Sequence, residues 1–196
     1  MAVRPSRPQL RDRYDRRRDE LVRQAARTFA RRGYDQTTMQ ELAAAMGLAT
    51  GALYHYFPGK ERLLIAICDQ LMEPLLGRAA ELAAADASTR DTLQALVRLW
   101  VGHVVEHRDH MLVFQQERHQ IEFGEDWRGV RAARKAFERL VADLLARALP
   151  GQDSRLRLLA LLGMVNHTAQ WYRARGPLNP VQIADGYLEL VLGERR

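Results

Sequence analysis

The sequence predicts an all-α protein. Apolar residues recur at intervals of three and four along most of the 196 residues, which is the spacing of one helical face. The sequence has neither the strict alternation of a strand nor a repeat of roughly 20–50 residues. Helix start signals are clear: Thr38 with Glu41 has the spacing of a capping box, and Asn179 precedes Pro180 as an N-cap with proline at the first helical position.

The helices are expected in the following order. The first spans about residues 15–32, and Gly33 ends it. Two short helices follow, and a longer one runs from Lys60 to about residue 81, with a possible kink at Pro74. The remaining helices are expected over residues 90–107, 109–122, 126–149, 154–175 and 180–192.

The two short helices form the most informative segment. The first ends at Gly47, because a residue without a Cβ enters the left-handed conformation at low cost. Leu48 is the apolar residue of the turn, and the second helix starts at Ala49 or Thr50 and stops before Pro58. A helix, a glycine turn and a second helix form the helix-turn-helix motif, whose second helix places its N-terminal residues against base edges.

The residue types at the start of the second helix suit a major groove. Thr50, Gly51 and Ala52 are small, so this end can approach the bases closely. Thr50 offers a donor and an acceptor to a base edge, and the Ala52 methyl can contact a thymine methyl. We therefore expect an N-terminal three-helix DNA-binding domain, followed by a helical domain that controls it.

Phosphate contacts are expected next to this helix. Tyr54 and Tyr56 carry hydroxyls within reach of the DNA backbone. Lys60 is the first residue of a helix, where a cation is unfavourable for the helix dipole, so we expect it to bind a phosphate outside the helix.

The alternative to a DNA-binding motif is that residues 37–60 form an ordinary helical hairpin. Under both interpretations the core contains Leu42, Leu53 and Phe57.

The positive charge of the chain is concentrated before this motif. The formal net charge is +6, and residues 1–33 hold eleven arginines against four acidic residues, so the remainder is close to neutral. Residues 1–14 are expected to form a basic flexible arm, which is typical of salt-sensitive DNA binding. A membrane-surface role is disfavoured because this arm lacks an apolar face.

Residues 37–64, TTMQELAAAMGLATGALYHYFPGKERLL, closely resemble the DNA-binding domain of the TetR (tetracycline repressor) family. The resemblance extends over about residues 16–76. It implies a DNA-binding domain over residues 15–76 and a ligand-binding and dimerisation domain over residues 77–196. It also implies a transcriptional repressor that binds a palindromic site on double-stranded DNA as a homodimer and is released by a small-molecule effector.

The resemblance also assigns DNA contacts by position. The phosphate contacts of the family fall on Thr38, Tyr54, Tyr56 and Lys60. Its base-reading positions fall on Gln40, Thr50, Gly51 and Ala52. The chain departs from the family at Ala49, where a capping Ser or Thr is common, so Thr50 is left with two alternative roles, as the helix cap or as a base contact.

The last two helices carry more apolar side chains than one small domain needs to bury, which indicates a partner. In TetR regulators the final two helices pair with those of a second copy as a four-helix bundle. The expected interface consists of Leu158, Leu162, Val165, Ile183, Tyr187, Leu190 and Val191.

Apolar and aromatic residues mixed with polar ones in the second domain suggest a ligand pocket between helices, although each of them would serve equally well as core. The candidates are Trp100, His103, Met111, Phe114, Arg118, His167, Trp171 and Tyr172. Residues 164–194 resemble regulators of fatty-acid and sterol breakdown, which implies an acyl-CoA as effector. Four basic residues would then meet its phosphates, unless they form a solvated helix face: Arg128, Arg131, Arg134 and Lys135.

Two other functions stay open. His103, His107 and His110 share a helical face, and histidines four residues apart can bind zinc, so a metal-sensing regulator is one alternative. An enzyme acting on acyl thioesters is the other, although the sequence carries no Gly-rich phosphate loop, G-x-S-x-G or H-E-x-x-H motif. We expect no cofactor and no resident metal.

The sequence also indicates a location. Cys68 is the single cysteine, so an internal disulfide is excluded, and it is expected in the core. An apolar leader is missing from the first residues, and the longest apolar run is too short to span a bilayer. These features predict a cytoplasmic protein that does not enter membranes.

Overall fold

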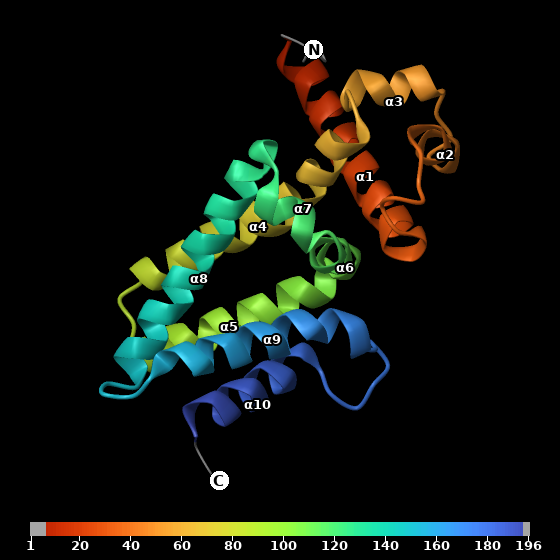
Figure 1. The fold of residues 1–196 in the computed structure, drawn as a ribbon. Coiled ribbons are helices and arrows are strands. Elements are labelled where there is room, and N and C mark those ends of the chain that lie inside the picture. Colours follow the sequence, from red (N-terminus) through yellow and green to blue (C-terminus); the bar gives the residue numbers. More distant parts are fainter. Residues whose placement is uncertain (1–6, 194–196) are drawn as a thin grey trace.

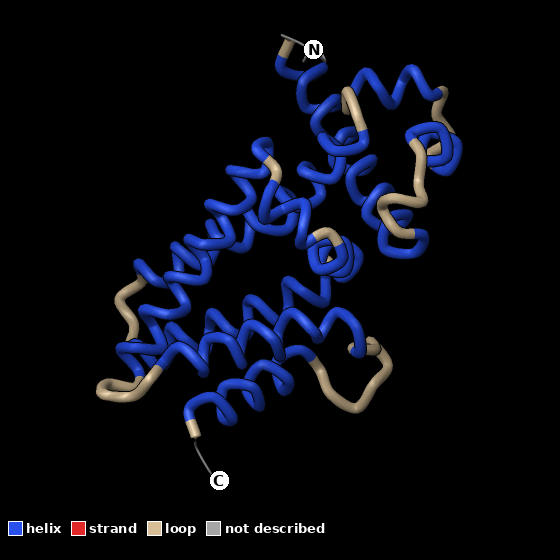
Figure 2. Tube along the Cα trace, in the orientation of Figure 1, coloured by secondary structure: helices blue, strands red, loops and turns tan. Residues whose placement is uncertain are grey.

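The structure is a computed structural model that describes residues 7–193, and this range contains helices and loops but no strand (Figures 1 and 2). The predicted all-α fold class is confirmed. No helix in this range is both long enough and apolar enough to cross a membrane. The long helices are α1 (Pro8–Arg32), α4 (Lys60–Ala84), α5 (Thr89–Glu106), α8 (Arg128–Ala148), α9 (Ser154–Trp171) and α10 (Pro180–Leu192). The short ones are α2 (Met39–Ala45), α3 (Thr50–Tyr56), α6 (Arg108–Gln116), α7 (Arg118–Phe123) and the 3-10 helix η1 (Glu125–Trp127).

Helix α1 begins earlier than the sequence predicted. Pro8 occupies its first turn, where the fixed φ of proline suits a helix, and Arg16 donates to the carbonyl oxygen of Asp12 at 3.2 Å. The second half of the predicted flexible arm, residues 8–14, is therefore helical. Residues 1–6 lie outside the described part of the chain.

Two predicted helices in the second half are also shorter than expected. The helix predicted over residues 109–122 is divided into α6 and α7 at Glu117, which has φ −96° and ψ 20°. The helix predicted over residues 154–175 ends at Trp171, because Tyr172 adopts an extended ψ of 138°. A turn follows, in which the Gly176 N–H donates to the carbonyl of Arg173 at 2.8 Å.

The helices enclose two apolar cores, and α4 contributes to both. Its first turns supply Leu63 and Ile67 to the core of α1, α2 and α3, whereas Leu71 and Leu75 belong to the core of α5, α8, α9 and α10. Cys68 is fully buried, and burial raises the pKa of its thiol. Because α4 runs through both cores, the predicted domain boundary at residues 76 and 77 falls inside a continuous helix.

Residues from the second half of the chain complete the first core. Val113, Ile121, Trp127 and Val130 come from α6, α7, η1 and α8, and each is at most 1% exposed among the side chains of the N-terminal helices. Figure 1 shows α6 and α7 between the N-terminal helices and the α5, α9 and α10 layer. At about 25 cal/mol per Å², burying a tryptophan side chain is worth several kcal/mol, so this contact holds the two parts together.

A hydrogen bond fixes the orientation of this contact. Trp127 Nε1 donates to Glu61 Oε1 in the first turn of α4 at 3.0 Å. Next to it, Arg62 forms an ion pair with Asp126 at 3.0 Å. Both side chains are about half exposed, so this pair contributes little to folding stability.

The second core is closed by α10, which packs against α5 and α9. Arg98 on α5 makes a bidentate pair with Asp185 on α10, with both N–O distances at 2.7 Å. Asn179 and Gln182 form a reciprocal capping box at the start of α10, and this helix has the bounds that the sequence predicted.

We expect Gly124→Ala to destabilise the chain by about 1–3 kcal/mol, because the added methyl would overpack a buried site. A Cβ at Gly124 would lie 2.2 Å from Cδ1 of the buried Trp127 ring. The matched control is Gly129→Ala, whose Cβ has no neighbour within 4 Å. Urea unfolding monitors both variants, and equal midpoints for the two would contradict the role given to Gly124.

Candidate DNA-binding surface and ligand cavity

The capping box at the start of α2 has the geometry that the sequence predicted. The Glu41 N–H donates to Thr38 Oγ1 at 3.2 Å, and the Thr38 N–H donates to Glu41 Oε2 at 2.8 Å. These hydrogen bonds satisfy two amides that the first turn of a helix leaves without partners. The pKa of the Glu41 carboxyl is lowered, chiefly by the Thr38 backbone N–H.

The turn between α2 and α3 also follows the prediction. Gly47 has φ +66°, the left-handed value that favours glycine, and the Leu48 N–H donates to the carbonyl of Ala43 at 2.9 Å. Leu53 and Phe57 are buried in the first core, which sets the roll of α3 and turns its opposite face outward.

The N-terminal end of α3 is free of side-chain caps. Ala49 is the N-cap residue and supplies no side-chain acceptor, and Thr50 is the first helical residue. Thr50 therefore does not take the capping role that the sequence left open. Gly51 and Ala52 are exposed, and a Cβ built at Gly51 meets nothing within 4 Å.

The other predicted DNA contacts surround this end of α3. Thr38 and Gln40 are exposed at the start of α2, although the Thr38 hydroxyl already donates to Glu41 Oε2 at 2.9 Å. Tyr54 is 47% exposed on α3. Tyr56 is half-buried because its ring stacks on Tyr14 of α1, with ring centroids 4.8 Å apart, a contact that the sequence did not reveal.

Lys60 has a partner inside the protein that the sequence did not reveal. Its Nζ donates to the carbonyl oxygen of Tyr34 at 2.9 Å and lies 4.2 Å from the centroid of the Tyr34 ring. Burial, together with the nearby Glu61 carboxylate, raises the pKa of the Tyr34 hydroxyl to about 12, so this hydroxyl stays protonated and uncharged. An ammonium has three N–H donors, so Lys60 keeps donors for a second acceptor.

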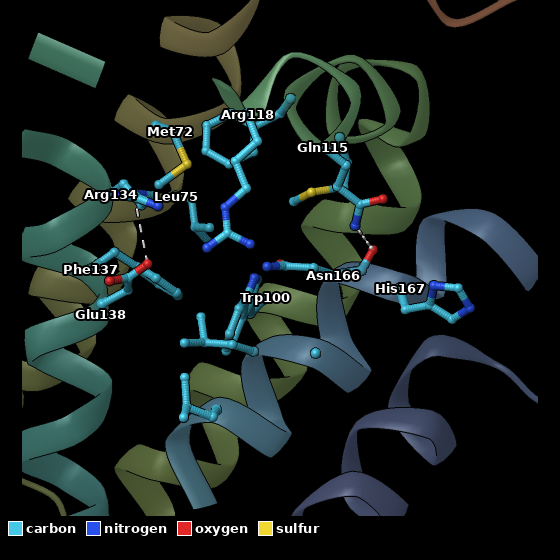
Figure 3. Close-up of a pocket in the computed structure, with 15 residues that line it drawn as sticks. Met72, Leu75, Trp100, Gln115, Arg118, Arg134, Phe137, Glu138, Asn166 and His167 are labelled. Atoms are coloured by element: carbon cyan, nitrogen blue, oxygen red, sulfur yellow. Dashed lines mark hydrogen bonds and ion pairs between the residues drawn. The ribbon is translucent and has the colours of Figure 1, made fainter. Parts of the chain in front are cut away.

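The second core contains a cavity of about 410 Å³ between α4, α5, α6, α7, α8 and α9 (Figure 3). Five buried apolar side chains line it, namely Met72, Leu75, Trp100, Met111 and Phe137. Three further apolar side chains are less buried, namely Phe114, Leu159 and Leu162. The polar side chains of the lining are Gln115, Arg118, Arg134, Glu138, Asn166 and His167. A mostly apolar cavity with a few polar groups is typical of small-molecule sites.

The structure separates the predicted ligand-binding residues into two groups. Those that line the cavity are Trp100, Met111, Phe114, Arg118 and His167. Three others do not line it: His103 faces α4, Trp171 is 42% exposed at the end of α9, and Tyr172 follows that helix. The sequence did not single out Met72, Leu75 or Phe137, because core and pocket residues have the same helical spacing.

Comparison with known families shows to which family the chain belongs. Residues 21–67 match the model described as "Bacterial regulatory proteins, tetR family". Residues 86–194, more than half of the chain, match the model described as "Tetracyclin repressor-like, C-terminal domain". The chain belongs to the TetR family.

Two relatives are similar to the chain over most of their length. The HTH-type transcriptional repressor KstR2 of Rhodococcus jostii is 30% identical over 190 residues, which cover 90% of this chain and 89% of the relative. KstR2 of Mycolicibacterium smegmatis is 28% identical over 186 residues, with coverage of 90% and 89%.

Solved structures show that the similarity extends over nearly the whole fold of this chain. The structure of the ketosteroid transcriptional regulator KstR2 of Mycobacterium tuberculosis has a TM-score of 0.82 at 26% identity and covers 90% of this chain and 93% of that one. The structure of AibR in complex with isovaleryl coenzyme A and operator DNA has a TM-score of 0.76 at 27% identity, with coverage of 89% and 97%.

The histidine face in this TetR-family chain lies between α4, α5 and α6. His103 Nε2 lies 2.8 Å from the carbonyl oxygen of Leu71, and His110 Nε2 lies 3.3 Å from Gln70 Oε1. Burial lowers the pKa of each of the three imidazoles, and the pKa of His110 falls to about 4. Between residues 7 and 193, no group of three or more His, Cys, Asp or Glu side chains is arranged to hold a metal ion.

Three of the residues predicted at the dimer interface are buried within their own chain. Val165, Ile183 and Val191 are at most 4% exposed and belong to the core of their own chain, where α9 and α10 pack against α5. Packing within one chain already accounts for their apolar side chains. Leu190 is 73% exposed, while the rest of the predicted set is half-buried, namely Leu158, Leu162 and Tyr187.

The outward faces of α9 and α10 instead present other apolar side chains, which we call the C-terminal apolar face. Its members are Leu156 on α9 and Leu190 on α10, which are 70% and 73% exposed and line one open hollow with Ala160, Met164 and Val191. A group of large exposed apolar side chains on neighbouring helices is typical of an interaction surface.

We expect the contribution of His110 to stability to be lost as the pH is lowered from 7 to 5. The folded pKa of His110, about 4, lies below the ordinary value of about 6.5, so the unfolded chain takes up the proton first and this contribution falls with the pH. The loss from His110 is about 2 kcal/mol. Urea unfolding at both pH values should show a smaller loss for His110→Gln than for the exposed His119→Gln. An equal loss in both variants would contradict the assignment.

Proposed function

We propose that the chain is a ligand-responsive transcriptional repressor. It binds a palindromic operator on double-stranded DNA as a homodimer, and a small molecule in the 410 Å³ cavity releases it. One observation carries this proposal: the exposed end of α3 belongs to a core that is completed by residues of the domain that contains the cavity. Binding in one part can therefore bias the position of the other.

The proposed DNA contacts divide into two classes. Base edges are contacted from the N-terminal ends of α2 and α3, by Gln40, Thr50, Gly51 and Ala52. Phosphates are contacted by Thr38, Tyr54, Tyr56 and Lys60. The exposure of Gln40, Ala52 and Tyr54 supports this division, as does the uncapped start of α3, where backbone N–H groups attract anions.

The homodimer forms through the C-terminal apolar face. Leu156 on α9 and Leu190 on α10 are exposed by 70% and 73%, and pairing two copies through a twofold axis would bury both. A dimer of this kind presents two recognition helices to successive major grooves, roughly 34 Å apart.

The proposed effector is a small molecule with an apolar part, and an acyl-CoA is the specific candidate. The solved structure of AibR is a complex with isovaleryl coenzyme A and operator DNA, and KstR2 is a ketosteroid transcriptional regulator. The apolar wall formed by Trp100, Met111 and Phe137 suits an acyl or ring system.

Arg131 already has hydrogen-bond partners within the protein. Its Nη1 donates to the carbonyls of Ile121 and Gly124 at 2.9 and 2.5 Å, so we do not propose that it binds phosphates.

The domain assignment follows from the same argument. We propose a DNA-binding domain over residues 15–76 and a ligand-binding and dimerisation domain over residues 77–196, with α4 running through both. We place the protein in the cytoplasm, where DNA and metabolic thioesters are available, and assign it no catalytic activity.

Selection of duplexes from a random pool, followed by titration, tests the function directly. The chain should enrich a palindrome and bind it more weakly as salt is raised. An acyl-CoA should release it. If no duplex is enriched at low salt, the proposal is wrong.

Two classes of variant should separate phosphate from base contacts. Tyr54→Phe and Lys60→Ala should each weaken binding about tenfold or more on every duplex, because each removes a hydrogen bond to a charged group. Gln40→Ala should change the ranking of duplexes that differ at one base pair by about 1–3 kcal/mol. Fluorescence anisotropy on a panel of single-base variants measures both. A uniform loss for Gln40→Ala would reject its role in base reading.

Leu190→Lys should convert the dimer into monomers, because a lysine in an apolar interface must lose its hydration. Leu10→Lys is the matched control: Leu10 is 48% exposed, but it lies on α1, far from α9 and α10 along the chain. Sedimentation equilibrium reports the mass of each variant. A Leu190→Lys protein that remains dimeric would show that the interface lies elsewhere.

A further inference from the structure

Two arginines, Arg118 and Arg134, line the cavity together with its apolar side chains. Arg118 opens α7, and its guanidinium points into the cavity toward Asn166 (Figure 3). It forms no hydrogen bond or ion pair with another residue of the described range, 7–193. Arg134 on α8 lines the same cavity, and its side chain is 15% exposed. An amphipathic ligand would therefore place its apolar part against the apolar side chains and its polar end at the two arginines.

Arg134 is only partly satisfied by its protein partners. Its Nη2 donates to Glu122 Oε2 on α7 at 2.8 Å. Its Nε is buried and lacks a hydrogen-bond partner within the described residues, because Glu138 Oε1 lies 3.9 Å away. A buried donor without an acceptor costs about 1–3 kcal/mol, which is a reason to look for a missing acceptor.

The existing partners of Arg134 can be exchanged. The side chains of Glu122 and Glu138 are 41% and 32% exposed, so water can solvate either carboxylate once it leaves the guanidinium. Ion pairs with this exposure are worth at most about 1 kcal/mol, which a well-placed bidentate anion would exceed.

We propose that Arg118 and Arg134 bind the anionic end of the effector in the cavity, and that this anion takes the place of Glu122 on Arg134. The ligand class is an apolar body that carries a carboxylate or a phosphate. The inference rests on the proposed function, because it assumes that the cavity is the effector site. The exchange also removes a link between α7 and α8, so binding loosens the helix that contributes Ile121 to the first core.

Calorimetric titration of the full chain tests the subsite with three probes: decanoate, methyl decanoate and decanoyl-CoA. The anionic probes should bind at least about tenfold more tightly than the neutral ester, and Arg118→Met should remove this advantage, a loss of about 10- to 100-fold. Arg139→Met is the control, since Arg139 is exposed on α8 and does not line the cavity. It should change affinity by about twofold or less.

The pattern among the probes identifies the source of the anion. If Arg118→Met weakens decanoate, the subsite takes a carboxylate; if it weakens only decanoyl-CoA, the subsite takes the phosphates of the carrier. Equal affinity of the ester and the anions, or no binding of either anionic probe, would overturn the proposal.

Glu122→Gln tests the exchange itself. Because the variant removes the competing carboxylate, it should tighten binding of the anionic probe several-fold and leave the ester unchanged, whereas Glu125→Gln on η1 should change neither. A purely structural Glu122 would give weaker binding of both probes, and that result would reject the exchange. The titrations contain no DNA, so their failure is distinct from failure of the chain to bind an operator.

Discussion

The burial of Trp127 and Ile121 among the N-terminal helices is the contact on which the rest of the structure depends. Both residues are 1% exposed, and the Trp127 indole N–H is fixed by Glu61 in the first turn of α4. Since α3 packs on the same core through Leu53, its position relative to the second domain is set by this contact. A DNA-binding surface that must meet two grooves at a fixed spacing needs such a constraint.

The same segment also reaches the cavity. Helix α7 contributes Arg118 to the cavity and Ile121 to the first core, and Glu122 ties it to Arg134 on α8. A ligand that alters the contacts of Arg118 or Arg134 therefore acts on a helix that is only six residues long and already packed against the DNA-binding part. This arrangement gives a physical path for regulation, in which differential contacts with the ligand shift the population of α7 positions.

Local signals in the sequence were enough to predict much of the fold. The capping boxes at Thr38 and Asn179 and the positive φ of Gly47 are determined by neighbouring residues, so α2, the turn and α10 are found as predicted.

Contacts between distant segments leave no such signal in the sequence. The hydrogen bond between Trp127 and Glu61, for example, joins residues 66 positions apart. Helical periodicity identified apolar faces on α9 and α10 but could not tell whether α5 or a second copy covers Val165, Ile183 and Val191. The pairing of Lys60 with Tyr34, 26 positions away, was missed because it joins separate segments.

Amide hydrogen exchange on the Trp127→Ala variant tests most directly whether the second domain completes the core of the first. Removing a buried tryptophan costs about 3–5 kcal/mol at its site. If the second domain completes the core of the first, protection should fall in α1, α2 and α3 together with α8, although the substitution lies far from the first three in sequence. Unchanged protection of α1, α2 and α3, with the loss confined to residues near position 127, would contradict the account.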